Sequence, residues 1–257
     1  MANQTQRDHF QVLHDKYQDH YYDRYSNYYR EKIIITKIKN ELKKSDNILE
    51  IGCGGGSNFR TFSKLGLING KYFAIDISPK AVENFNEMVS DNEKKYYASV
   101  ANFAEQNLDL GGKFSLILFV GVLHHMTNDL EEVFKNIDTH LEKHGFVIFI
   151  EPNADFLNSI RKIWYKVSDN FDHTNERALT AKEIHSFAKQ NNLQLDELIY
   201  FGSIGFFLIL QSMILKTPKW FKRATYIPLT TFDLWIEKVK SKYLLSSMIC
   251  TYRRPKE

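Results

Sequence analysis

Residues 47–58 read NILEIGCGGGSN, an apolar segment that runs directly into a glycine-rich loop. The segment from Asn47 to Ile51 is typical of a buried strand, and the residues after the loop have the pattern of a helix. Glycine lets the backbone turn sharply and approach a ligand without a Cβ in the way. Because Gly52, Gly54 and Gly56 alternate, we predict a strand–loop–helix unit that binds a small ligand.

The spacing of this loop argues against two common nucleotide-binding motifs. The dinucleotide fingerprint G-x-G-x-x-G would need glycine at position 57, where this chain has Ser57. No G-K-[ST] sequence follows, as a phosphate-binding P-loop would require. Glu50 would also repel a pyrophosphate. The pattern favours a ligand that is cationic or neutral near the loop, and a tight turn without a ligand is the structural alternative.

Strands and helices are predicted to alternate beyond the loop. Further strands are expected at 71–77, 96–100, 114–120, 146–151, 193–201 and 243–252, and helices at 57–65, 78–91, 128–143 and 180–190. The third of these helices should stop at Gly145, and Thr180 with Glu183 forms a capping box for the fourth. Such alternation predicts an α/β, Rossmann-like, seven-stranded and mostly parallel sheet with helices on both faces.

The ends of the chain depart from this alternation. Residues 7–44 contain neither glycine nor proline and predict two helices, with Ser26 as a candidate N-cap. We predict an N-terminal helical lid at 1–45 and a main domain at 46–257, with helical cap insertions at about 152–179 and about 202–242. The second insertion lies before the last strand.

Four motifs between residues 47 and 153 resemble the class I S-adenosylmethionine-dependent methyltransferases, specifically the small-molecule methyltransferase group. They are LEIGCGGGSN, FAIDISPKAVE, FSLILFVGVLHHM and GFVIFIEPN. The resemblance implies that the main domain is a methyltransferase domain. It also implies that S-adenosylmethionine is the cofactor and that a small-molecule acceptor receives the methyl group.

The resemblance further implies the residues of the cofactor site. The loop glycines would hold the methionine part, and Asp76 at the end of the second strand would hold both ribose hydroxyls. Capping of the next helix is the other role open to Asp76. Asn102 stands where the family usually has an aspartate, so we expect weaker binding of the adenine amine. The other expected cofactor contacts are Glu50, Ile77, Phe103, Val120, Tyr21 and Tyr25.

Because the sulfonium of the donor is already activated, the protein must mainly align the acceptor in line with it and, for a hydroxyl or an acid, remove a proton. Ligands of open α/β sheets bind beyond the carboxyl ends of the strands, which points to residues 121–126 and 151–153. His125 is the preferred proton acceptor, with Glu151 and His173 as further candidates. Packing or helix capping by the histidines is the structural alternative.

A metal site is not predicted. His140 and His144 have the i, i+4 spacing of a metal pair, but they lie at a helix end, where a positive side chain complements the helix dipole. We assign no metal.

Composition and charge narrow the partners. The 257 residues are 43% hydrophobic and 25% charged with a formal net charge of +3, which fits a folded globular protein and is too mild to indicate nucleic-acid binding. With only Cys53 and Cys250, and no visible secretion signal, we predict a cytoplasmic protein. The other functions left open are a nucleic-acid methyltransferase and a non-catalytic cofactor-binding or membrane-adaptor protein of the same fold.

The segment 202–242 combines an apolar run, Ile204 to Leu215, with basic residues that include Lys219, Lys222 and Arg223. We predict that it caps the pocket of an apolar or lipid-like acceptor and that it is a candidate for peripheral contact with the inner membrane surface. The sequence predicts no oligomeric state.

Overall fold

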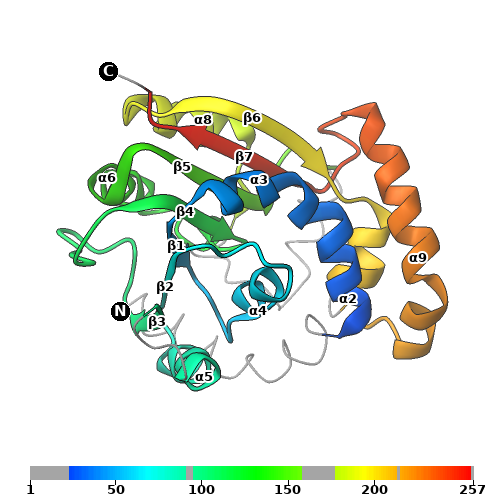
Figure 1. Cartoon of the computed structure of the whole chain (residues 1–257). Helices are drawn as coiled ribbons and strands as arrows, with labels where there is room; N and C mark the ends of the chain where they lie inside the picture. Colours follow the sequence, from blue (N-terminus) through cyan, green and yellow to red (C-terminus); the bar gives the residue numbers. More distant parts are fainter. Residues whose placement is uncertain (1–22, 91–94, 158–176, 213–214, 256–257) are drawn as a thin grey trace. The chain divides into compact units, whose positions relative to one another are not determined.

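The structure is a computed structural model that describes residues 23–90, 95–157, 177–212 and 215–255. In these residues, seven strands follow the sheet order β3-β2-β1-β4-β5-β7-β6 (Figure 1). They are β1 (Asn47–Ile51), β2 (Lys71–Asp76), β3 (Tyr96–Val100), β4 (Phe114–Val120), β5 (Leu141–Pro152), β6 (Gln194–Phe201) and β7 (Ser247–Arg253). Strand β7 runs antiparallel to β5 and β6, and the other described pairs are parallel. The predicted mostly parallel, seven-stranded fold is confirmed.

Two compact units interleave along the chain. The first comprises the described residues of Met1–Asp46, Gly52–Asn102 and Gly202–Lys238, and the second those of Asn47–Ile51, Phe103–Phe201 and Val239–Glu257. The first contains α2 (Arg24–Tyr29), the π-helix η1 (Arg30–Ile35), α3 (Thr36–Lys44), α4 (Ser57–Lys64), α5 (Pro79–Val89), the π-helix η4 (Phe206–Leu210) and α9 (Lys219–Ile236). The second contains the 3-10 turn η3 (Leu123–His125), α6 (Leu130–His140) and α8 (Ala181–Gln190). A further 3-10 turn, η5, covers Glu237–Val239.

One helical rod from α2 through η1 to α3 forms the described N-terminal part of the first unit. It begins at Asp23, whose Oδ1 accepts hydrogen bonds from the backbone N–H groups of Tyr25 and Ser26 at 2.9 and 2.8 Å. The prediction of Ser26 as the N-cap was therefore wrong: Ser26 lies inside the helix and donates to the carbonyl of Ile209. Residues 1–22 lie outside the described part, and the lid at 1–45 stays a prediction.

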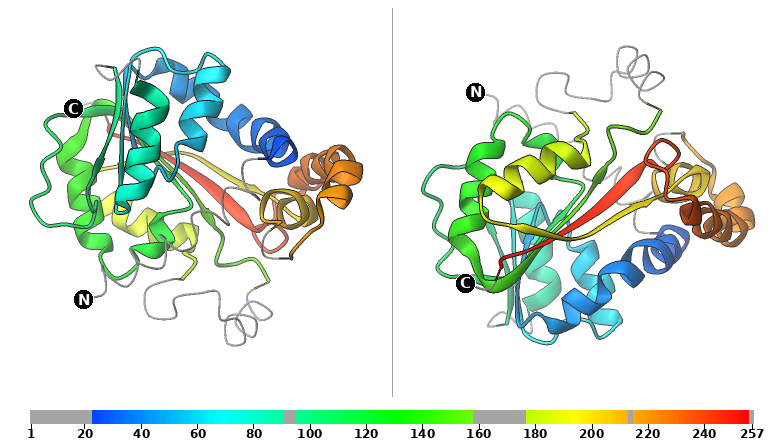
Figure 2. Two further views of the ribbon diagram at one scale, coloured as in Figure 1. Left: turned by 90° about the horizontal axis from the view of Figure 1, so that it is seen from below. Right: turned by 90° about the horizontal axis from the view of Figure 1, so that it is seen from above.

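The predicted helical insertion before the last strand is present as η4, α9 and η5. Helices α2, η4 and α9 lie side by side (Figure 2). The buried Asp233 of α9 accepts hydrogen bonds from the Tyr29 hydroxyl at 2.6 Å and from the backbone N–H groups of Gly205 and Phe206. Burial, together with the Asp233 charge, raises the pKa of Tyr29 well above its usual value, so Tyr29 remains a neutral donor.

In the second unit, β4 and β5 are buried on both faces, as their apolar runs predict. The helix predicted to end at Gly145 ends earlier, at His140, and Gly145 lies within β5. Parallel pairing explains this difference, because the ladder to β4 includes both Phe114 with Leu141 and Leu116 with Phe146, with a register shift between them. Strand pairing therefore overrides the helix-stop signal.

The capping box of α8 is confirmed. Thr180 Oγ1 accepts from the Glu183 N–H at 3.1 Å, and Glu183 Oε2 accepts from the Thr180 N–H at 2.8 Å. Partial burial alone would raise the pKa of Glu183, but the hydrogen bonds from Thr180 and Arg177 outweigh it and hold the pKa below its usual value. The interaction therefore stabilises the fold above the unfolded-state pKa and is lost as the pH falls through the folded-state pKa.

Thr180→Ala is expected to lower the free energy of unfolding by about 1 kcal/mol at neutral pH, because an N3 donor loses its acceptor. The variant should also lose less stability than wild type as the pH falls below about 4. Urea denaturation at several pH values measures both effects. Thr139→Ala is the matched control, since the exposed Thr139 hydroxyl donates only to the Lys135 carbonyl. Equal behaviour of the two variants would contradict a stabilising capping box.

Candidate active site

The glycine loop has the backbone conformation that its spacing predicts. Gly52, Gly54 and Gly56 have φ values of +69°, +52° and +77°, the left-handed region that residues with a Cβ rarely adopt. The loop is tied to the end of β2, since the N–H groups of Gly52 and Cys53 donate to the Ile75 carbonyl at 2.8 and 3.2 Å. The alternating glycines are therefore required by the fold of the loop itself.

Asp76 organises the same loop. Its Oδ2 accepts from the Gly54 N–H at 2.9 Å, and its Oδ1 accepts from the Ser78 N–H at 2.8 Å. The N-cap of α5 is Ser78, whose hydroxyl accepts from the Ala81 N–H. A carboxylate oxygen can accept more than one hydrogen bond, so the group that orders this loop is also of a type that binds ligand hydroxyls. The geometry fits a cofactor that brings two hydroxyls to the loop.

Gly56→Ala is expected to cost about 2 to 4 kcal/mol of stability, from left-handed strain and from overpacking. An added Cβ would lie 2.5 Å from Met88 Cε and 2.9 Å from Phe85 Cδ2. Gly66→Ala is the matched control, because Gly66 has φ +63° with nothing within 4 Å of the added Cβ. We expect it to cost only the strain, about 1 to 2 kcal/mol. Equal losses in urea denaturation would show that overpacking at Gly56 contributes nothing.

A second polar cluster lies in the second unit, where β4 and β5 end. Glu151 is 1% exposed. Its Oε1 accepts from the N–H groups of Val122 and Leu123 at 3.0 and 2.8 Å, and its Oε2 lies 2.7 Å from His124 Nδ1. Val120 pairs with Ile150 in the ladder, so the residues that follow each strand are brought together. One carboxylate thus fixes both the turn after β4 and the ring of His124.

This arrangement prepares His124 for proton transfer. A neutral imidazole that donates from Nδ1 to a carboxylate keeps Nε2 as its acceptor, so this pairing makes His124 a candidate base. The His124 side chain keeps 17% of its surface exposed. Sequence reasoning preferred the adjacent His125, whose ring centroid lies 4.0 Å from that of His124. His125 stays a prediction, and the contact with Glu151 at the end of the neighbouring strand adds His124 as a second candidate.

Two other predicted cofactor contacts pack against the protein itself. Phe103 is 0% exposed and packs on Phe119 with the ring centroids 5.6 Å apart, and its contact with the cofactor stays a prediction. Tyr25 packs against Tyr226 of α9 at 5.1 Å and accepts a hydrogen bond from Arg24.

The remaining predicted residues occupy varied environments. Glu50 is fully buried in β1. The side chains of Ile77, Asn102 and Val120 are half-buried. Tyr21 and His173 lie outside the described residues.

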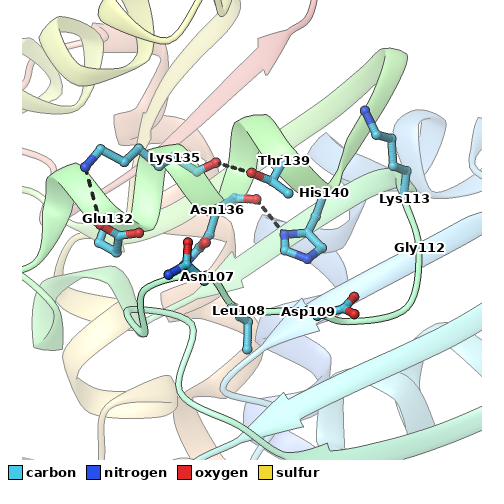
Figure 3. A pocket seen from close by; sticks show the side chains of 10 residues that line it. All are labelled: Asn107, Leu108, Asp109, Gly112, Lys113, Glu132, Lys135, Asn136, Thr139 and His140. Carbon is cyan, nitrogen blue, oxygen red and sulfur yellow. Dashed lines mark hydrogen bonds and ion pairs between the residues drawn. The ribbon is translucent and has the colours of Figure 1, made fainter.

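A cavity of about 560 Å³ lies in the second unit between α6 and the residues that precede β4 (Figure 3). His140 lines it, with Nδ1 at 2.8 Å from the Asn136 carbonyl and Nε2 accepting from the Leu110 N–H at 3.4 Å. This cavity lies at the amino end of β4, whereas His124 follows the carboxyl end of β4 and Glu151 lies in the last residues of β5. It is therefore separate from the polar cluster, and we do not assign the cofactor to it.

Comparison with protein families identifies this architecture. The family described as "Methyltransferase domain" matches residues 22–198, which is more than half of the chain. The chain belongs to this family. The resemblance to class I methyltransferases and the predicted enzyme class are thereby confirmed. A comparison with curated proteins gives no match.

Solved structures share the fold of this methyltransferase. Magnesium protoporphyrin IX methyltransferase from Synechocystis is 15% identical with a TM-score of 0.61, covering 98% of this chain and 99% of that chain. The N-methyltransferase NodS from Bradyrhizobium japonicum is 14% identical with a TM-score of 0.53, covering 91% and 89%. Geranyl diphosphate methyltransferase is 14% identical with a TM-score of 0.54, covering 86% and 84%. These likenesses establish the fold.

The described residues contain neither a cluster that could hold a metal ion nor a helix that could span a membrane. Within the described ranges, no three or more His, Cys, Asp and Glu side chains gather as a metal site would require. Across the same part of the methyltransferase, every helix is too short or too polar to traverse a bilayer.

Proposed function

We propose that this methyltransferase binds S-adenosylmethionine through the loop from Gly52 to Gly56 and Asp76, and transfers its methyl group to a small, apolar or lipid-like organic acceptor. The observation that carries the proposal is the position of the Asp76 carboxylate, which ends β2 and accepts hydrogen bonds from the left-handed glycine loop and from Ser78. A carboxylate there suits a ligand that brings hydroxyls to the loop. When bound, the cofactor supplies a methyl group on a positively charged sulfur.

The cofactor is supported by relatives as well as by geometry. The similar structures of NodS and magnesium protoporphyrin IX methyltransferase contain S-adenosylhomocysteine, and that of geranyl diphosphate methyltransferase contains S-adenosylmethionine. The absence of a Cβ at Gly52 and Gly54 allows the close approach of such a ligand to the backbone. We assign the methionine part to the loop and the ribose hydroxyls to Asp76.

His124 is assigned the role of proton acceptor from the methyl acceptor. Glu151 holds its Nδ1 and so leaves Nε2 to take a proton. Such a base matters when the nucleophile is a hydroxyl or another weakly acidic group, because it gains a bond to carbon and must lose its proton. The buried Glu151 is a positioning residue, since its oxygens already accept from the turn after β4 and from His124.

An apolar acceptor is favoured by the substrates for which two similar methyltransferases are named. Geranyl diphosphate and magnesium protoporphyrin IX both have large apolar parts, and these names belong to methyltransferases of the same fold. A nucleic-acid acceptor receives no comparable support, and the net charge of +3 does not favour it.

Incubation with S-adenosylmethionine labelled in the methyl group and with fractions of a cell extract tests the proposal. We expect label in an organic-soluble small molecule, and none when Asp76→Ala replaces the wild type. Label in nucleic acid, or none in any fraction despite cofactor binding, would contradict the proposed acceptor class.

A further inference from the structure

Helix α9 has an inward side that is fixed by two buried charges. Lys222 is 1% exposed and donates from Nζ to Asp23 and to the Ser26 hydroxyl, the latter at 2.9 Å. Asp233 is 0% exposed and accepts from the Tyr29 hydroxyl at 2.6 Å. These contacts set the rotation of α9 about its own axis, so the opposite side of the helix faces away from α2 (Figure 2).

That opposite side is apolar and aromatic. Trp220 is 71% exposed, Trp235 60% and Ile227 48%, and Phe232 and Leu234 beside them are 38% and 39% exposed. The two tryptophans are separated along the helix by roughly 22 Å, from the rise of an α-helix. Large apolar side chains gathered on one exposed face mark an interaction surface.

The charges on this side are all positive. Lys219, Arg223 and Lys238 are exposed. The acidic residues of the same stretch are turned inward: Asp233 is buried, and the Glu237 carboxylate lies 2.8 Å from Lys37 Nζ. We call the exposed set the outer face of α9. It comprises Lys219, Trp220, Arg223, Ile227, Phe232, Leu234, Trp235 and Lys238.

We propose that the outer face of α9 docks on the surface of a bilayer that contains anionic lipids, with the helix parallel to the membrane plane. Tryptophan rings belong at headgroup depth, and Lys and Arg can reach anionic headgroups while their stems stay apolar. The aromatic residues and Arg223 would suit a protein interface as well, but an all-positive set that includes two lysines complements anionic headgroups, and lysine is depleted in protein–protein interfaces. None of these residues belongs to the cofactor loop or to the Glu151 cluster, so the inference does not rest on the proposed function.

The residues that are exposed in the structure differ in part from those that the sequence predicted for membrane contact. Of the apolar run from Ile204 to Leu215, Ile209 and Leu210 are buried in η4, and Lys222 is enclosed by its hydrogen bonds. Ile204 and Leu215 of the same run are exposed, and both exposed tryptophans lie along α9.

Flotation with vesicles tests the proposal. We expect the wild type to float with vesicles of phosphatidylcholine containing about a third phosphatidylserine, and much less with phosphatidylcholine alone. The triple variant Lys219→Glu, Arg223→Glu, Lys238→Glu should bind about a hundredfold less tightly, because each cation contributes about fivefold near an anionic surface. Trp220→Ser with Trp235→Ser should lower binding about tenfold or more and reduce the shift of tryptophan emission caused by vesicles.

The matched control is Lys39→Glu, Lys182→Glu, Lys189→Glu, which changes the net charge equally at exposed lysines elsewhere. It should bind vesicles within about threefold of the wild type if the α9 face is the contact. No flotation of the wild type at low salt, or an equal loss in the control, would overturn the proposal. A wild-type dimer without vesicles that becomes monomeric in the tryptophan variant would also overturn it, in favour of a protein interface. Unchanged melting temperature and S-adenosylhomocysteine affinity keep this test separate from that of methyl transfer.

Discussion

His124→Ala is expected to lower kcat by about a hundredfold or more while leaving the affinity for S-adenosylhomocysteine nearly unchanged. The reason is the pairing of His124 Nδ1 with the buried Glu151 at 2.7 Å, which directs the free Nε2 toward proton transfer. Initial rates with the acceptor found by methyl labelling measure kcat, and calorimetry measures the affinity. Glu151→Gln should also lower kcat, because an amide can turn an N–H toward Nδ1 and so reverse the tautomer.

His125→Ala is the matched control for this prediction, because it removes the same ring one residue away. We expect less than about a tenfold loss of kcat, since Glu151 holds His124 rather than its neighbour. A larger loss in His125→Ala than in His124→Ala would return the role to the residue that the sequence favoured.

Asp76→Ala is expected to weaken binding of S-adenosylhomocysteine by about a hundredfold. Each lost hydrogen bond from a ligand hydroxyl to a carboxylate contributes about 1.5 to 3 kcal/mol. The loop also loses the acceptor for the Gly54 N–H, which Asp76 Oδ2 holds at 2.9 Å. Isothermal titration calorimetry on the cofactor-stripped protein measures the change.

Ser78→Ala separates ligand binding from helix capping in this experiment. It removes the hydroxyl that caps α5, and it leaves the Asp76 carboxylate with its backbone donors. We expect a loss of stability of about 1 kcal/mol and no more than a threefold change in affinity. If Ser78→Ala weakens binding as much as Asp76→Ala does, Asp76 acts through the start of α5 and not through the ligand.

Local sequence patterns were sufficient to predict the structure wherever it depends on neighbouring residues of a single element. The conformations of Gly52, Gly54 and Gly56 follow from spacing alone, because only glycine adopts positive φ cheaply at alternate positions. The capping box of Thr180 and Glu183 is similarly local. These features require no knowledge of contacts between distant segments.

Contacts between distant segments account for the differences. Gly145 failed as a helix stop because pairing with β4 extends β5 back to Leu141. His124 was not preferred as a candidate base from the sequence, because its partner Glu151 lies 27 residues further along. Only the pairing of β4 with β5 brings the two residues together. Lys222 was predicted as one of the basic residues of a membrane-contacting segment, but its hydrogen bonds to Asp23 and Ser26 enclose it. In each case the missing information was long-range pairing and not propensity.

The most direct test of the account is calorimetric titration of purified, cofactor-stripped wild-type protein with S-adenosylhomocysteine. We expect saturable one-to-one binding and a melting temperature of the protein that rises with ligand concentration, because the ligand binds only the folded state. Asp76→Ala should show about a hundredfold weaker binding in the same cell. Absence of heat and of any shift in melting temperature at millimolar ligand would contradict the claim that the glycine loop and Asp76 form a cofactor site.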